Sequence, residues 1–431
     1  MDFQSSVQDI DEVTKKITVV VGKSRVVKEY EDSVKQVGRT ARLDGFRPGK
    51  VPRKMVERLM GDRIKFDITN KLINEGLRSA FEEHKLDTVG QPQIDLKDME
   101  IAKDLEFTAV VELYPQPAIS NYLNRSIKVG KKTIVDKDVE EAISRISESR
   151  AELKPIEGRT QAALDDVAAL SVSVQIEEGE FSRPEPFVDQ LGLGRLSKEA
   201  EEQFVGLSIG ESKDVTIVAK EDHPNENLRG KKLTYRGNLH GLYSKTLPTL
   251  DDAFAKSLGM GVETMDALRA KVKEQLIQEA EDDARGESQS ELLNLLIKEN
   301  PFKVPSSLVD DEIRGLVARY GFAGKGAQPE SIDVSLFRPQ FEEVATNRIR
   351  SAIIIDRIGS QEEIKVEDSD REAMIEKVAN QNGTTVEAAK KALLDKSRIM
   401  SFLLEVRRTK ILDFLMAKTK VDFVKPEEAK K

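Results

Sequence analysis

The stretch ARLDGFRPGKVPRKM, residues 41–55, holds the side chains best suited to bind another molecule. Its single aromatic residue, Phe46, offers an apolar contact, and Arg47 carries a planar guanidinium that matches the oxygens of a phosphate or a carboxylate. Gly45 and Gly49 accept backbone conformations that are closed to other residues. A loop that is shaped in advance loses little conformational entropy when it docks. These features favour a docking element.

Basic residues crowd around this aromatic tip, although the chain as a whole is acidic. They are Arg42, Arg47, Lys50, Arg53 and Lys54. Pro48 fixes its own φ and pushes the residue before it toward an extended conformation, which stiffens the tip. Because such side chains bind phosphates, we interpret residues 41–55 as a contact to a polyanion. The alternative is a solvated turn between two helices, with the ring of Phe46 packed into its own domain.

The elements that would position this loop form a small α+β unit. The strand KITVVV comes first, and the spacing of apolar residues predicts a helix from about Ser24. After the loop, Pro52 occupies a position at which a helix can begin without losing an amide hydrogen bond. Apolar residues then predict two helical pieces that are broken near Gly61. The alternating strand DLEFTAVVELYP closes the unit.

The next segment differs in its predicted secondary structure. A charged helical stretch, DKDVEEAISRISESRAEL, leads into short strands between about Leu170 and Leu242. The strands are separated by turn signals such as Glu178-Gly179. We expect a compact, mostly β domain of roughly 90 residues, inserted between helical stretches.

Everything after Pro248 is predicted to be helical. Four long stretches show a 3.6-residue period, and Thr384–Glu387, TTVE, matches a capping box. Short breaks between them favour extended helical hairpins, and VKPEEAKK is typical of a frayed tail. We expect most apolar residues here to be core, and we expect the same of each methionine. These residues are Ile353, Ile354, Ile355, Leu403, Leu404, Phe414, Met265, Met374, Met400 and Met416.

Long hairpins bury less surface per residue than a compact bundle does. Some apolar surface should therefore remain on their inner faces, where it could hold unfolded segments weakly.

Composition excludes several classes of function. A chain of 431 residues is too long for one core, and a net charge of −9 argues against a general nucleic-acid coat. The absence of Cys removes disulfides, thiolate nucleophiles and Cys-based metal sites. His84, His223 and His240 are far apart in sequence and show no ligand spacing. We therefore expect no metal and no cofactor.

The sequence also predicts where the protein resides. The N-terminus has acids where a signal peptide needs basic residues, and no apolar stretch follows. No apolar run approaches the roughly 18 residues that span a bilayer. We expect a soluble, cytoplasmic protein that does not contact membranes.

The stretch GFRPGKVP resembles the ribosome-docking signature G-F-R-x-G-K-x-P of the bacterial trigger factor family. GLSIGE, LPTLDDAFAKSLG and VPSSLVDDEI resemble later segments of the same family, so the resemblance covers essentially the whole chain. It implies an α+β multidomain fold with a ribosome-docking domain, a linker and helix, an inserted FKBP-like β domain, and an extended all-α chaperone domain. The corresponding residues are 1–115, 116–155, 156–245 and 246–431.

The same resemblance implies partners. In the family, Phe46, Arg47 and the next residue touch a ribosomal protein and nearby rRNA beside the exit tunnel of the large ribosomal subunit. Many members carry a second basic residue where this chain has Pro48. The implied docking residues are Arg42, Gly45, Phe46, Arg47, Pro48, Gly49, Lys50 and Arg53. Nascent and unfolded polypeptides are the implied clients, and a homodimer off the ribosome is left open.

The middle segment resembles the FKBP-type prolyl isomerases but departs from their pocket pattern. Ser171 stands at an aromatic position, Ser182 replaces an acid, and Ala200 replaces the aromatic floor. The implied pocket positions are Ser171, Phe181, Ser182, Phe187, Leu196, Ser197, Ala200 and Tyr235. A wider and wetter cleft grips a proline ring less well, so we expect weak isomerase activity at most and leave the enzyme assignment open.

Three functions are consistent with these observations. The first is a chaperone that is independent of ATP, because no Gly-Lys-Ser/Thr phosphate loop is present, and that shields nascent chains during folding and export. The second is a prolyl isomerase with substrate-holding arms. The third is an RNA-binding assembly factor that uses the basic face around Arg39, Arg42 and Arg47.

Overall fold

A computed structural model of the chain describes residues 3–40, 51–96, 99–220, 225, 228–322, 331–395 and 398–426. The chain divides into two compact units. One comprises residues 1–130 together with 285–431, and the other comprises residues 131–284. The second unit is thus an insertion into the first. The predicted α+β multidomain class is confirmed.

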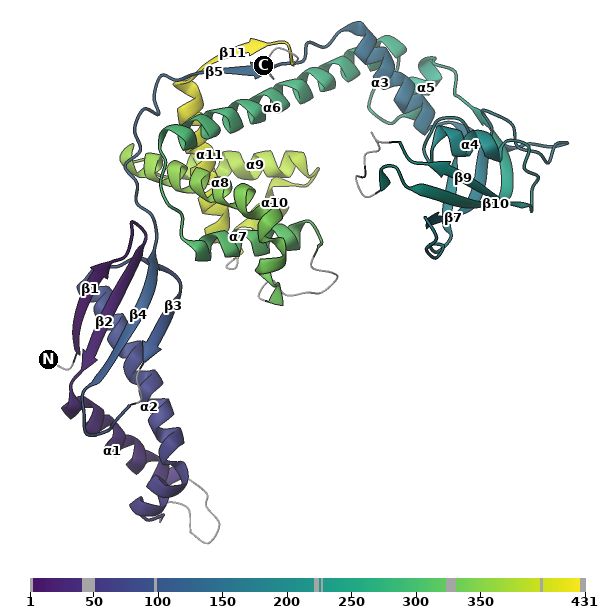
Figure 1. Cartoon of the computed structure of the whole chain (residues 1–431). Coiled ribbons are helices and arrows are strands. Elements are labelled where there is room, and N and C mark those ends of the chain that lie inside the picture. The colour runs from purple at the N-terminus through teal and green to yellow at the C-terminus, as the bar shows by residue number, and fades with distance from the viewer. Residues whose placement is uncertain are drawn as a thin grey trace. The chain divides into compact units, whose positions relative to one another are not determined.

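The first unit begins with an α+β lobe built on an antiparallel sheet (Figure 1). Among the described residues its strand order is β1-β2-β4-β3. The strands are β1 (Phe3–Asp9), β2 (Thr14–Val21), β3 (Thr88–Leu96) and β4 (Leu105–Leu113). Ile17 pairs with Ala109 and Val19 with Phe107, and all four side chains are buried on the face that the helices cover. Both strands predicted from alternation are confirmed.

Two helices cover this sheet, α1 (Lys23–Thr40) and α2 (Arg53–Glu83). Helix α2 begins beside Pro52, as predicted, and Pro52 is its N-cap, one residue before the first helical position. The predicted break near Gly61 is wrong, because α2 runs through this residue without interruption. Gly61 is buried against α1, and the atom nearest to a Cβ added there would be Tyr30 Oη, at 4.0 Å. A Cβ at this position would therefore fit without displacing α1.

The rest of the first unit is a helical lobe. It contains the last part of α6, which crosses the boundary between the units, and, among the described residues, five further helices. These elements are α6 (Met265–Glu299), α7 (Ser306–Arg319), α8 (Val334–Gln361), α9 (Asp368–Gln381), α10 (Val386–Leu393) and α11 (Ile399–Ala417). Leu296, Ile354, Ile358 and Leu415 form its main core, and the α7–α8 hairpin has a smaller core of its own.

The C-terminal end departs from the prediction that everything after Pro248 is helical. Residues Lys420–Val424 form strand β11, which pairs in parallel with β5 (Ser126–Gly130). The strand's partner lies almost 300 residues earlier, so local sequence could not reveal it. The cap near TTVE is also shifted by one residue. Thr385, rather than Thr384, accepts the bond from the amide of Ala388, at 3.3 Å.

The second unit contains a small β domain, as predicted. Its described strands form an antiparallel sheet of order β6-β10-β7-β8, and β9 also pairs with β10. They are β6 (Glu152–Pro155), β7 (Val167–Ile176), β8 (Glu185–Gln190), β9 (Ser212–Val218) and β10 (Lys232–Thr246). Helix α4 (Lys198–Phe204) packs Phe204 into the core. A second small core joins α3 (Asp136–Ser149), α5 (Asp252–Ser257) and the start of α6.

Candidate functional site

Most of the predicted docking loop lies outside the described residues. This applies to Arg42, Gly45, Phe46, Arg47, Pro48, Gly49 and Lys50. The structure describes the two helix ends that carry the loop and Arg53, the predicted docking residue in the first turn of α2.

These two helices form a stiff support. Glu29 of α1 is buried and accepts a hydrogen bond from Lys71 of α2. Arg25 lies 3.4 Å from Glu29 and donates to Glu75 of α2 at 3.0 Å. At the end nearer the loop, a Cβ added to Gly38 would be in ordinary van der Waals contact with Val56, at 3.7 Å. Because ion pairs link the two helices, the loop is attached to helices that are held together.

A pocket of about 440 Å³ opens between the helix ends. Its lining residues are Glu31, Asp32, Val34, Lys35, Gly38, Arg39, Val51, Arg53 and Val56. Arg53 donates from Nε to Glu57 at 2.8 Å and lies 3.7 Å from Glu31. The hydrogen bond to Glu57, followed by the charges of Glu57 and Glu31, raises the pKa of Arg53. Its charge is thus locally compensated, whereas Lys35 and Arg39 extend the basic surface along α1.

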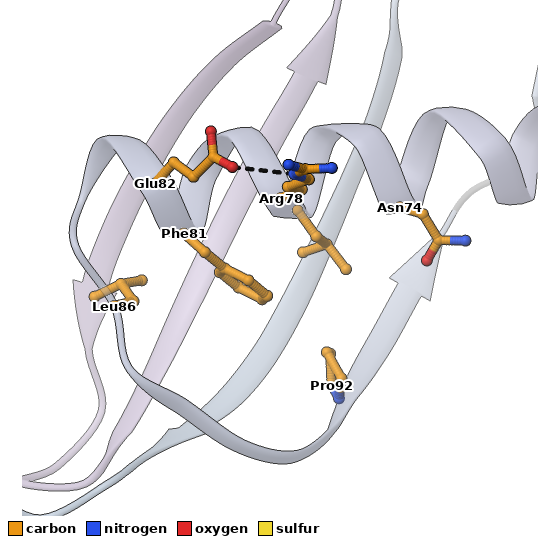
Figure 2. Close-up of a pocket in the computed structure, with 7 residues that line it drawn as sticks. Asn74, Arg78, Phe81, Glu82, Leu86 and Pro92 are labelled. Atoms are coloured by element: carbon orange, nitrogen blue, oxygen red, sulfur yellow. Dashed lines mark hydrogen bonds and ion pairs between the residues drawn. The ribbon is translucent and has the colours of Figure 1, made fainter.

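A second pocket, of about 360 Å³, lies at the other end of α2. Figure 2 shows Phe81 pointing from α2 into the space bordered by Leu86 and Pro92. Arg78 and Glu82 form an ion pair beside it, with the Nε–Oε1 distance at 3.0 Å. No sequence pattern pointed to this pocket, because its residues come from a helix, a turn and a strand and no regular spacing unites them.

The inserted β domain holds a pocket of about 440 Å³ at the place where α4 meets β9 and β10. Three of the eight predicted positions line it, namely Leu196, Ser197 and Tyr235. Burial raises the pKa of Tyr235, so its hydroxyl stays neutral and able to donate. Apolar Leu196, Ile217 and Leu233 line it together with charged Arg195, Lys198 and Lys220, so the pocket can contact both an apolar group and a polar one.

The remaining predicted positions lie elsewhere in the domain. Phe181 stacks beneath Arg236, with the guanidinium carbon 4.0 Å from the ring centre. Ser182 exchanges two hydrogen bonds with Val174, and Ser171 is hydrogen-bonded to His240 at 2.6 Å.

The last two predicted positions, Phe187 and Ala200, help to pack the domain. Phe187 pairs with Leu170 across β8 and β7 and is partly buried in the domain core. Ala200 is completely buried in α4. Neither side chain lines the pocket.

One carboxylate that no sequence motif singled out fixes the wall of this pocket. Glu201 has no exposed surface and accepts hydrogen bonds from the amides of Gly192, Gly194 and Leu196, at 2.9, 2.7 and 2.9 Å. Three donors offset the cost of burying a charge. The sequence offers no signal for this role, because Glu201 is one of three glutamates in KEAEEQF and only the structure shows that it is buried.

Comparison with known proteins decides the family. Sequence models of the bacterial trigger factor protein and of its C-terminus match residues 3–146 and 264–417. The trigger factor of Anaeromyxobacter sp. (strain Fw109-5) is 30% identical over 95% of this chain and 97% of its own length. The chain belongs to the trigger factor family. The trigger factor of Magnetococcus marinus is also 30% identical, over 90% of this chain and 89% of its own. A solved trigger factor chaperone is 20% identical over 96% of this chain and 99% of its own, with a TM-score of 0.48.

The helical lobe of this trigger factor family member carries exposed apolar side chains. Tyr320 and Phe322 follow α7 and are 58% and 56% exposed. Both rings lie next to Phe341 of α8, with ring centres 6.3 and 6.0 Å away. Leu336, near the start of α8, is 73% exposed. The end of the α7–α8 hairpin therefore presents an aromatic surface, which we call the hairpin tip (Tyr320, Phe322 and Leu336).

The predicted core residues of this lobe divide into two groups. Ile353, Ile354 and Ile355 are buried, and Leu403, Phe414, Met374 and Met416 are partly buried against the cores, as predicted. Met265 is buried too, in the small core of the second unit. The prediction is wrong for Met400, which is 66% exposed, and Leu404 is an exception among the other apolar residues, at 61% exposed. They are four residues apart and share one face of α11, so periodicity alone could not tell a buried face from an open one.

None of the described helices has the length and apolarity required to cross a bilayer.

Proposed function

We propose that this trigger factor family member is an ATP-independent chaperone that docks on the large ribosomal subunit and shields emerging polypeptides. The observation that carries the proposal is the hairpin tip, because two aromatic rings that are more than half exposed lie side by side there, and exposed apolar clusters mark interaction sites. Family membership over nearly the whole chain supports it.

The proposal assigns a role to each part of the chain. Residues 1–115 dock, 116–155 connect, 156–245 form the FKBP-like domain, and 246–431 hold clients. The contacts on the ribosome are a protein and rRNA beside the exit tunnel. The protein works in the cytoplasm, partly bound to ribosomes, and we include a homodimer as the form it takes when free.

Client binding would rest on many weak apolar contacts. Each exposed ring buries on the order of 100 Å² against a client, which is worth about 2 to 3 kcal/mol before the cost of ordering is subtracted. Such contacts are non-directional, so they suit unfolded segments of any sequence. Exposed Met400 and Leu404 extend the same chemistry to α11.

The docking half of the proposal is tested by co-sedimentation with translating ribosomes. We expect Phe46→Ala with Arg47→Ala to abolish co-sedimentation and to leave suppression of aggregation in solution intact. The matched control is Phe66→Ala with Arg63→Ala, which removes an exposed aromatic and arginine from α2 outside the loop. Equal loss in both double variants would contradict the assignment. Loss of binding to naked rRNA as well would favour the RNA-binding alternative.

The chaperone half is tested by aggregation of a denatured client. We expect Tyr320→Ser with Phe322→Ser to raise the chaperone concentration needed for half-suppression several-fold while ribosome binding is kept. Leu247→Ser with Leu250→Ser is the control, since both residues are exposed between β10 and α5. Unchanged suppression in the aromatic variant would remove the hairpin tip from the proposal.

A second candidate function is prolyl isomerisation by the inserted domain, favoured by the pocket that holds Leu196 and Tyr235. An apolar cleft lowers the barrier of roughly 18–20 kcal/mol to peptide rotation by desolvating the amide. A refolding reaction limited by proline isomerisation measures it. Acceleration that Tyr235→Ala removes would establish the activity, and no acceleration by the wild-type chain would exclude it.

A further inference from the structure

Helix α7 is capped by a residue from a different lobe. Its own N-cap is Pro305, whose side chain cannot accept a hydrogen bond, and its first turn has no acidic residue. The amides of Ser306 and Ser307 instead donate to Glu112 of β4, at 3.1 and 2.9 Å. The Ser306 hydroxyl donates to the same carboxylate at 2.8 Å. Glu112 therefore satisfies the open amides of a helix that begins 194 residues later.

Two further contacts surround this cap. Gly90 of β3 has a φ of +68°, and a Cβ added there would lie 2.5 Å from the Cβ of Ser307. Only glycine permits both the backbone conformation and the close approach. Lys303 lies 3.2 Å from Asp11, in the turn between β1 and β2. Asp11 is held in place because its other oxygen accepts bonds from the amides of Val13 and Thr14.

The contact between Glu112 and the start of α7 has short hydrogen bonds but involves few residues. A carboxylate at a helix N-terminus is stabilised by the helix dipole as well as by the amides. The pKa of Glu112 reflects this balance: burial alone would raise it, but the hydrogen bonds from Ser307 and Ser306 outweigh burial and lower it. The contact consists of polar groups that water could replace, which suits a contact that forms and breaks.

The helix that Glu112 holds also carries the hairpin tip at its far end. Helix α7 has 14 residues and is about 21 Å long, so a small tilt at the cap moves Tyr320 and Phe322 appreciably. The strand that holds Glu112 belongs to the same sheet that α1 and α2 cover. The contact at Glu112 thus joins the proposed docking lobe to the helix that carries the proposed client surface.

We propose that Glu112, Gly90 and Asp11 form a releasable latch that holds the α7–α8 hairpin against the α+β lobe and sets the position of the hairpin tip. The inference rests on the proposed function for its consequence, namely that release of the latch changes client capture. The latch itself is a property of the free chain and needs neither ribosome nor client.

The test is a distance measurement between the two lobes in the full chain. Because the sequence has no Cys, spin labels can be attached at Lys103→Cys and Val344→Cys, both at exposed positions. We expect a narrow distance distribution in the parent chain. Glu112→Ala should broaden and shift it, and Gly90→Ala should do the same by steric displacement of Ser307. Glu112→Gln, which keeps an acceptor of the same shape, should give an intermediate result.

Glu106→Ala is the matched control, since Glu106 is an exposed glutamate on the same strand. It should leave the distribution unchanged. If Glu112→Ala does not fold, Gly90→Ala and Glu112→Gln still decide the matter. Distributions equal to that of the parent chain in those two variants would overturn the latch.

The functional consequence has a separate readout. Release of the latch should change the concentration for half-suppression of aggregation at least two-fold and should leave ribosome co-sedimentation unaltered. A parent chain that neither suppresses aggregation nor binds ribosomes would overturn the proposed function and leave the distance result standing. A latch that opens without changing suppression would overturn the coupling.

Discussion

At the residue scale, Glu201 shows how one buried charge can order a pocket wall. Its carboxylate accepts hydrogen bonds from three backbone amides in the segment between β8 and α4. Those amides have no helical or sheet partner of their own, so the segment depends on the side chain. The pocket that includes Leu196 and Ser197 therefore exists in its observed shape because a glutamate lies behind it.

We predict that Glu201→Gln lowers the hydrogen-exchange protection of the amides of Gly192, Gly194 and Leu196 by at least ten-fold. Loss of a charge-assisted acceptor costs about 1.5 to 3 kcal/mol, which corresponds to that factor or more. Glu199→Gln, an exposed neighbour on the same helix, is the control. Retained protection in the Glu201 variant would show that the segment is ordered by other contacts.

Individual residues also show how far comparison with family motifs can predict this pocket. The resemblance to the FKBP-type isomerases implied Leu196, Ser197 and Tyr235, and these three residues line one pocket. It could not foresee that Ser171 would bond to His240 or that Phe181 would stack on Arg236. Those partners are set by strand register and by a bulge near His240, neither of which a local pattern contains.

At the element scale, two glycines of α2 differ in what surrounds them. A Cβ on Gly61 would meet nothing nearer than 4.0 Å, whereas a Cβ on Gly76 would lie 3.0 Å from Val19 and 3.3 Å from Phe107. Only the second position needs glycine for packing against the sheet. The first is glycine in a helix interior, where it weakens the helix.

We predict opposite signs for the two alanine substitutions. Gly61→Ala should stabilise the α+β lobe by about 0.5 to 1 kcal/mol, because alanine loses less backbone entropy in a helix. Gly76→Ala should destabilise it by about 1 to 3 kcal/mol through overpacking. Native-state hydrogen exchange of the α2 amides measures both. Destabilisation by Gly61→Ala would mean that the continuous helix needs a flexible point there.

An ion pair between Asp370 and Lys410 joins α9 and α11, and its contribution to stability depends on pH. Asp370 accepts a hydrogen bond from Lys410 at 2.7 Å and another from the amide of Glu367 at 2.8 Å. The bond from Lys410, then that from Glu367, lowers the pKa of Asp370 below its ordinary value of 3.8. The same hydrogen bond raises the pKa of Lys410 above its ordinary value of 10.5.

The expected dependence follows from these directions. The Asp370 carboxylate contributes fully to the stability of the fold above pH 3.8, and this contribution is lost as the pH falls through the lowered pKa of Asp370. The Lys410 ammonium contributes fully below pH 10.5, and its contribution is lost as the pH rises through the raised pKa of Lys410. Asp370→Asn should therefore lower the melting temperature of the helical lobe most between these limits. A difference from the parent chain that is the same well below pH 3.8 as at neutral pH would contradict this account.

Elements were predictable where the pattern was local. The alternation of Phe107, Ala109 and Val111 gave β4, and helical periodicity gave the long helices of the C-terminal half. Strand β11 was not predictable, since five residues of KVDFV become a strand only beside β5. The continuity of α2 was also hidden, because the sequence does not distinguish a glycine inside a continuous helix from a glycine that ends one.

At the scale of the whole molecule, an acidic chain is proposed to bind an acidic particle. Its net charge of −9 works against this, and Arg53 is already paired with Glu57 and Glu31. The attraction must then come from a few cations of the loop and from Lys35 and Arg39 on α1. Their number is small, so their contribution is open to measurement.

We predict that ribosome affinity falls with salt on a logarithmic slope of about −2 to −3, as expected when three or so phosphates are contacted. Lys35→Ala with Arg39→Ala should make this slope shallower. Lys23→Ala with Lys28→Ala, at the opposite end of α1, is the control. A slope near zero would mean that Phe46 and apolar contacts supply the binding.

The pairing of β11 with β5 has a consequence for how this protein is made. Strand β5 leaves the ribosome almost 300 residues before the strand beside which it lies. The first unit can be completed only after β11 has been synthesised, whereas residues 131–284 can fold while synthesis continues. A protein proposed to guard unfinished chains would thus itself remain unfinished until β11 emerges.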